Sequence, residues 1–319
     1  MSFLDFEKPI VELENKLQDI KRMAASGSKK VNMDPEINKL EQKLQKMKED
    51  VYKNLTAWQR VQIARHPKRP YTLDYIRMMS TDFLEIHGDR LFADDFALIG
   101  GFASIEGRKV MIMGHQKGRD TKENVLRNFG CAHPEGYRKA IRLMKLAGKF
   151  KVPVVVFIDT PGAYPGVGAE ERGQAQAIAE NLRDMADIQV PIIATIIGEG
   201  GSGGALGIGV ADRVLILQNA YYSVISPEGC ASILWRSALK APEAAEALKL
   251  TGEDLLKFGI VDEIIPEPPG GAHRAPEQVA NLLCQSLIKY IDELTVLPPE
   301  KLMDLRYQKY RQIGEFNEK

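Results

Sequence analysis

The chain has 319 residues, 44% of them hydrophobic, which suits one large or two ordinary globular domains. Lys and Arg total 43, as do Asp and Glu, so the zero net charge argues against a global attraction to nucleic acid or anionic membranes. Its three cysteines form no CxxC pair, and no apolar run has the length of a signal-peptide core or a membrane span. We therefore expect a reduced, cytoplasmic protein with no metal site in this chain.

Residues 1–66 are predicted to form a helical arm. Apolar residues recur at spacings of three and four in two otherwise charged segments, 10–20 and 37–51, as in amphipathic helices. Ala25-Ser26-Gly27-Ser28 is expected to break the first helix, and Asp34-Pro35-Glu36 has the cap, proline and acid of a helix start. The product is a helical hairpin that either packs on its own core or docks on another subunit.

A hairpin of strands is predicted further along the chain. Before it, the basic segment 65–70 is either a solvated connector or a phosphate contact, and Tyr71 to Ile86 has the apolar spacing of a helix. Phe96 to Ile105 and Lys109 to Gly114 are two apolar runs joined at Glu106-Gly107-Arg108, which indicates a β-hairpin. A helix is expected over 138–150.

Two similar strand–loop–helix units come next. The runs 152–158 and 190–197 each begin with Val-Pro, are wholly apolar and lead into a glycine-rich loop. A helix over 169–186 follows the first loop, and a second helix is expected after Gly204. Such strands are typical of a parallel sheet buried on both faces. Further strands are predicted over 212–217, 221–225 and 259–265, and further helices over 227–237, 242–250 and 252–258, before a Pro/Gly loop at 266–276 and a helical C-terminal part.

The second glycine loop, Gly198 to Gly204, allows three functional interpretations beside a purely structural one, in which its glycines only permit tight packing. Residues 198–203 fit GxGxxG, although the dinucleotide motif also needs an acid about twenty residues on, where this chain has Leu217-Gln218-Asn219-Ala220. Residues 200–204 fit the GxSxG nucleophile elbow, with His273 as base. In the third, the amides of Gly203 and Gly204 form an oxyanion hole for an enolate oxygen.

The longer motifs resemble those of the carboxyltransferase alpha subunit of bacterial acetyl-CoA carboxylase. The likeness covers nearly the whole chain and is carried by Asp159-Thr160-Pro161-Gly162-Ala163-Tyr164-Pro165-Gly166, Glu170-Glu171-Arg172-Gly173-Gln174, Gly198-Glu199-Gly200-Gly201-Ser202-Gly203-Gly204-Ala205-Leu206 and Tyr222-Ser223-Val224-Ile225-Ser226-Pro227-Glu228. This resemblance implies an α/β, crotonase-like (ClpP/crotonase) superhelix of ββα units with an N-terminal helical hairpin. The expected domains are an N-terminal arm at 1–66, a crotonase-like carboxyltransferase domain at 67–296 and a charged helical tail at 297–319.

The resemblance also implies an activity. The family transfers a carboxyl group from carboxybiotin, held on a biotin carboxyl carrier protein, to acetyl-CoA, which gives malonyl-CoA for fatty-acid biosynthesis. The expected partners are a beta subunit in an α2β2 assembly, the carrier protein and biotin carboxylase. Zinc is expected in beta, and ATP is expected to be used by biotin carboxylase rather than bound by this chain.

The family's site residues carry over to the glycine loops. Gly203 and Gly204 are expected to be the backbone oxyanion hole for biotin, and the site is expected to be lined by Gly162, Ala163, Gly201, Ser202 and Ala205. Lys117, Arg119 and Lys122 are expected either to meet CoA phosphates or beta, or to stay solvated. Two other functions remain open: a non-catalytic scaffold, and a crotonase-type hydratase or isomerase that would need a carboxylate pair drawn from Glu170, Glu171 and Glu199.

Overall fold

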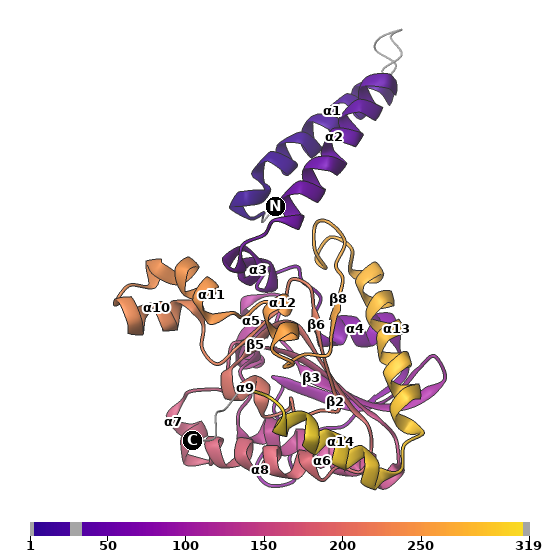
Figure 1. Ribbon diagram of the computed structural model, residues 1–319, viewed down its shortest axis with the longest axis vertical. Helices are drawn as coiled ribbons and strands as arrows, with labels where there is room; N and C mark the ends of the chain where they lie inside the picture. The colour runs from indigo at the N-terminus through magenta and orange to yellow at the C-terminus, as the bar shows by residue number, and fades with distance from the viewer. Residues whose placement is uncertain (1–2, 26–33, 315–319) are drawn as a thin grey trace.

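A mixed sheet forms the centre of the protein in the computed structural model, which describes residues 3–25 and 34–314 (Figure 1). Within these residues its strands are β1 (Thr81–Glu85), β2 (Leu98–Ile105), β3 (Arg108–His115), β4 (Val154–Thr160), β5 (Ile192–Gly201), β6 (Arg213–Leu217), β7 (Tyr221–Ser223) and β8 (Glu263–Ile265). They lie in the order β1-β2-β3-β4-β5-β6-β8, and β7 pairs with the end of β5. The β1–β2 and β2–β3 pairs are antiparallel, and the other pairs are parallel.

The predicted hairpin is confirmed. β2 and β3 are joined through Glu106 and Gly107, whose φ angles are +44° and +80°. A two-residue hairpin turn needs this left-handed backbone, because its twist then matches the twist of the strands.

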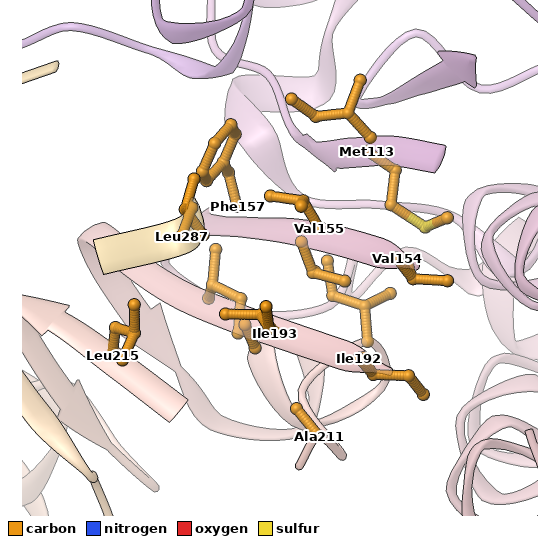
Figure 2. Close-up of a cluster of buried hydrophobic side chains, with 14 of the residues drawn as sticks. Met113, Val154, Val155, Phe157, Ile192, Ile193, Ala211, Leu215 and Leu287 are labelled. Atoms are coloured by element: carbon orange, nitrogen blue, oxygen red, sulfur yellow. The ribbon is translucent and has the colours of Figure 1, made fainter. Parts of the chain in front are cut away.

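The two apolar runs form the adjacent parallel strands β4 and β5, in which every residue is buried. Helices α6 (Pro134–Phe150), α8 (Gln174–Ala186) and α14 (Pro299–Arg311) lie on one side of the sheet, and α4 (Thr72–Met79) and α13 (Pro276–Thr295) lie on the other (Figure 1). Figure 2 shows Val155 of β4 and Ile193 of β5 in this core, with Leu287 of α13 packed near them. Cover on both faces explains why neither strand alternates with polar residues.

Shorter helices connect the strands and build the periphery. They are α3 (Ala57–Ala64), α5 (Thr121–Leu126), α7 (Val167–Glu171), α9 (Ser202–Leu206), α10 (Pro227–Trp235), α11 (Ala241–Leu248) and α12 (Gly252–Lys257). The cap predicted for α10 is present, because the Ser226 hydroxyl accepts a hydrogen bond from the Gly229 amide at 3.1 Å. Among the described residues, no helix combines the length and the apolar character needed to cross a membrane.

Two helix predictions are wrong in part. The helix expected over 71–86 ends at Met79, and Thr81 to Glu85 instead form β1, which pairs with the edge of β2. Pairing with β2 therefore outweighs the local helical spacing. The helix expected over 169–186 is divided into α7 and α8 at Gly173, whose φ of +82° is incompatible with a continuous helix.

The N-terminal hairpin projects from the body (Figure 1). Its helices, α1 (Lys8–Ala25) and α2 (Asp34–Lys53), pack on each other through a small core that includes Ile10, Leu17 and Leu44. Of the break predicted at 25–28, residues 26–28 lie outside the described residues. After the hairpin, α3 packs on the body, where Val61 belongs to one cluster with Tyr221 and Leu250.

The last helix, α14, is fastened to the body by a buried arginine. Arg306 is 2% exposed, and its guanidinium donates to both oxygens of Asp212 at 2.8 and 2.9 Å. It also donates to the carbonyls of Met185, Ile188 and Val190 at 2.8 to 3.0 Å. One side chain therefore ties α14 to the end of α8 and to the starts of β5 and β6.

Candidate active site

The two glycine-rich loops meet at one edge of the sheet. β4 and β5 are parallel neighbours, and Thr160 at the end of β4 pairs with Gly200 near the end of β5. The carboxyl ends of parallel strands are where ligand sites form in α/β proteins, because the loops that leave them converge there. β5 extends through Gly201, and α9 begins at Ser202.

Glycine is required where these loops touch. A Cβ atom on Gly204 would lie 2.4 Å from the carbonyl carbon of Gly162 and 2.5 Å from the nitrogen of Ala163. A Cβ atom on Gly201 would lie 2.2 Å from the Pro161 oxygen. The predicted site residues of the β4 loop and of the β5 loop are therefore brought into direct backbone contact.

A cavity of about 380 Å³ opens beside the second loop, and Ser202 and Gly203 form part of its wall. The rest of the lining is mostly apolar: Leu206, Tyr222, Ser223, Val224, Leu248, Lys249, Leu255, Phe258 and Ile260. Gly204 and Ala205 are buried and are not among the residues that line the cavity. An apolar pocket with a few polar groups at one edge is the usual form of a small-molecule site.

Three charged side chains from successive strand ends meet beneath the glycine loops. Lys117 follows β3, Asp159 is the penultimate residue of β4, and Glu199 lies two residues before the end of β5. The Lys117 ammonium lies 2.7 Å from Asp159 Oδ1 and 2.7 Å from Glu199 Oε2. The Glu199 amide also donates to Asp159 Oδ1 at 2.9 Å. We call these three residues the central triad.

Burial disfavours the charged forms of Glu199 and Lys117, but neighbouring opposite charges stabilise them. Burial raises the pKa of Glu199, yet the Lys117 ammonium and the Arg65 guanidinium outweigh it and lower that pKa to about 2. The pKa of Lys117 is raised, because Asp159 and Glu199 outweigh the cost of burying the ammonium. Both residues are therefore charged at neutral pH.

Arg65 extends the network from the triad to α10. Its guanidinium donates to Glu199 Oε1 at 2.7 Å and to Glu228 Oε1, in the first turn of α10, at 2.5 Å. The Tyr221 hydroxyl donates to the same Glu199 oxygen at 2.8 Å. Arg69 is fully buried against Glu267. The basic segment 65–70 is therefore not a solvated connector, and that alternative is wrong for both arginines.

The polar loop after β3 is only partly free to meet a phosphate. Lys117 is committed to the triad, so its expected role as a surface cation is wrong. Arg119 lies over the Tyr71 ring at 3.9 Å and pairs with Asp74. Lys122 is exposed and keeps both of its predicted alternatives.

The geometry weakens the two better-known glycine motifs. The residues of the GxGxxG match lie largely inside β5, and the helix that follows them, α9, has only five residues. His273, the base required by the nucleophile elbow, stacks on His66 at 3.9 Å between ring centroids and lies 3.8 Å from Glu7. These contacts join His273 to the start of the arm. A hydratase or isomerase would need Glu199 beside a second acid from the predicted set. Its carboxylate instead pairs with the cations Arg65 and Lys117.

Sequence reasoning found the glycines and missed the triad. A signal was present, since a charged residue stands at or just after the end of each of three successive apolar strands. Within residues 3–25 and 34–314, no group of three or more His, Cys, Asp or Glu side chains is arranged to hold a metal ion.

Comparisons with known proteins agree with the predicted family. A family model described as acetyl co-enzyme A carboxylase carboxyltransferase-like matches residues 3–314. Relatives from Geobacter metallireducens and Thermus thermophilus, both called acetyl-coenzyme A carboxylase carboxyl transferase subunit alpha, are 56% identical over 315 residues. The matches cover 99% of this chain and 98% and 99% of those relatives.

Two solved structures share the architecture. A transcarboxylase 12S structure has a TM-score of 0.56 at 23% identity, over 72% of this chain and 44% of that one. The beta subunit of P. aeruginosa geranyl-CoA carboxylase has a TM-score of 0.54 at 15% identity, over 75% of this chain and 45% of that one. At these identities the likeness concerns the fold alone, and it confirms the predicted crotonase-like α/β architecture.

Proposed function

The chain belongs to the acetyl-coenzyme A carboxylase carboxyltransferase-like family, and we propose that its glycine loop is the biotin-facing half of an active site shared with a beta subunit. Membership makes the chain a subunit of a carboxyl-transferring enzyme with a role in fatty-acid biosynthesis. The proposal concerns what this subunit contributes to the reaction and through which residues.

One observation carries the proposal: the cavity of about 380 Å³ that Ser202 and Gly203 border. Its volume and its apolar lining, with Leu206, Phe258 and Ile260, suit a compact ring system such as the bicyclic ring of biotin. Ser202 and Gly203 lie in the first turn of α9, where amide hydrogens have no partner within the helix, and such donors would suit the ureido oxygen of that ring. Gly162, Ala163, Gly201 and Ala205 would support this turn through the loop contact described above.

The chemistry needs donors rather than a nucleophile. Transfer exchanges a nitrogen–carboxyl bond of biotin for a carbon–carbon bond at the acetyl α-carbon, and the α-proton passes to the biotin nitrogen. Negative charge develops on the ureido oxygen as the first bond breaks. Gly203 and Gly204 would donate their amide hydrogens to that oxygen, and removal of one such donor typically costs about 3–4 kcal/mol in kcat. Ser202 would then act only as a spacer.

The remaining parts of the assembly follow from the family. The acetyl thioester, the carrier protein that bears carboxybiotin and the beta subunit are proposed partners, and biotin carboxylase would use ATP elsewhere in the complex. We keep the division into an arm at 1–66, a carboxyltransferase domain at 67–296 and a tail at 297–319 as part of the proposal. The cytoplasmic location also stays a prediction.

The reverse reaction tests the shared site. The purified chain, alone and mixed with a beta subunit from the same source, is assayed for malonyl-CoA decarboxylation with free biotin as the acceptor. We expect activity only in the mixture, and only when biotin is present. Activity of the isolated chain would favour a stand-alone crotonase-type enzyme, and an inactive mixture in which both subunits are folded and associated would favour a scaffold.

A further inference from the structure

The ladder between β4 and β5 is interrupted where the two glycine loops begin. Ile158 pairs with Ile196, but the next pair is Thr160 with Gly200, so three residues of β5 lie opposite the single residue Asp159. Beyond this irregularity a single pair, Thr160 with Gly200, continues the ladder between the two strands. Side-chain contacts at this point therefore supplement the ladder in holding the two loops in register.

The central triad occupies this interruption. Asp159 is the residue of β4 opposite the bulge, and Glu199 is the last of the three bulged residues of β5. The Lys117 ammonium bonds to both carboxylates at 2.7 Å, and Asp159 accepts the Glu199 amide. The space is fully used, because a Cβ atom on Gly198 would lie 2.5 Å from Asp159 Oδ1. The triad therefore connects β4 and β5 where regular backbone hydrogen bonds between them are missing.

The triad also lies close in sequence to the proposed donors. Asp159 stands three residues before Gly162, and Glu199 stands four residues before Gly203. Arg65 continues the network from Glu199 to Glu228 at the start of α10. A shift of Lys117 would therefore move both loops relative to each other.

We propose that Lys117 is a positioning residue for carboxyl transfer: its ammonium fastens the loop after β4 to the loop after β5 and so fixes the Gly203 and Gly204 amides at the cavity. This inference rests on the proposed function, because it assumes that these amides act in the reaction. Lys117 does not need to touch the substrate.

The test compares kcat, KM and stability in the assembled enzyme. Lys117→Met keeps most of the length of the side chain and removes the charge. We expect kcat to fall at least tenfold while KM for malonyl-CoA stays within threefold, because the proposed function places biotin, and not the thioester, at the glycine loop. Lys145→Met is the matched control: Lys145 also pairs with a carboxylate at 2.6 Å, but on the exposed face of α6, and its kcat should be unchanged.

A double variant separates positioning from stability. Lys117→Met leaves two buried carboxylates facing each other, and a further Glu199→Gln change removes one of these charges. We expect Lys117→Met/Glu199→Gln to regain most of the lost Tm but not the lost kcat, because the loops are still not fastened by a cation. If Lys117→Met alone does not fold, the double variant is compared with the wild type directly.

Two results would overturn the inference: wild-type kcat in Lys117→Met, or recovery of kcat in step with Tm in the double variant. A wild-type assembly without biotin-dependent decarboxylation would instead overturn the proposed function, so the two failures are distinguishable.

Discussion

Gly203 and Gly204 are neighbours with different surroundings. A Cβ atom on Gly203 would meet only Ile178 Cδ1, at 3.7 Å, whereas a Cβ atom on Gly204 would clash with the backbone of Gly162 and Ala163. The first glycine faces the cavity, and the second lets the loops approach each other. A substitution at Gly203 therefore tests contact with the cavity, and a substitution at Gly204 tests the close approach of the two loops.

Gly204→Ala is expected to lower kcat about a hundredfold, the scale of losing an oxyanion donor, because the added methyl group pushes the two loops apart. The measurement is biotin-dependent malonyl-CoA decarboxylation by the variant assembled with beta. Gly148→Ala, at a helical position where a Cβ atom meets nothing within 4 Å, is the matched glycine control.

Full activity of Gly204→Ala would remove Gly204 from the site. Ser202→Ala in the same assay should keep most of the activity, because the proposed mechanism has no use for its hydroxyl. A loss of a thousandfold or more, approaching the roughly millionfold loss on removal of a catalytic serine, would instead support the hydrolase interpretation.

At the scale of elements, the period and length of apolar runs predict a helix or strand correctly where tertiary packing agrees with them. The hairpin at Glu106 and Gly107 and the strands β4 and β5 follow from local patterns alone. β1 does not, because Phe83 and Ile86 continue the helical spacing of α4 and only the neighbouring edge of β2 makes 81–85 a strand. The predicted helical C-terminal part is confirmed by α14, but its charged sequence does not show that the body encloses Arg306.

The candidate site likewise has one part that the sequence predicts and one part that it does not. Its glycines lie within short, contiguous motifs, so a sequence shows them directly. Lys117 lies 42 residues from Asp159 and 82 from Glu199, and only the parallel order of β3, β4 and β5 brings them together. Their pairing could not be predicted without the sheet.

Arg306→Met is expected to lower the free energy of unfolding by about 3–5 kcal/mol, because it leaves the Asp212 carboxylate and several carbonyls buried without their cation. Urea unfolding followed by circular dichroism measures the change. Lys301→Met is the control on the same helix, where an exposed pair with Asp304 is worth less than about 1 kcal/mol. A change below about 1 kcal/mol in Arg306→Met would show that α14 contributes little to the stability of the body.

At the scale of the whole molecule, the arm is joined to the body at its base. Glu7, which precedes α1 and is buried, accepts a hydrogen bond from the Tyr52 hydroxyl at 2.5 Å and lies 3.4 Å from the Arg274 guanidinium. Burial raises the pKa of Glu7, but the His273 ring, the Tyr52 hydroxyl, the Leu4 amide and Arg274 outweigh burial and lower that pKa to about 2. The charged form of one carboxylate therefore holds α1, α2 and the 266–276 loop together.

The stability of this attachment should depend on acid. The folded pKa of Glu7 lies below its ordinary value, so its contribution is complete above about pH 4.5 and is lost as the pH falls toward about 2. Glu7→Gln should therefore be less stable than the wild type by about 3 kcal/mol at pH 7, and this gap should narrow from pH 5 to pH 3. Urea unfolding at each pH gives the gap, with Glu12→Gln, an exposed site on α1, as the control. A gap that does not change with pH would contradict the assignment.

The raised pKa of Lys117 has a consequence for side reactions. An amine attacks a thioester only when it has lost its proton, and the two carboxylates of the triad keep Lys117 as an ammonium. In an enzyme whose proposed substrates are acyl thioesters, a lysine amine without its proton would be acylated by any thioester that reached it. Holding the cation between Asp159 and Glu199 therefore keeps Lys117 unreactive toward such substrates.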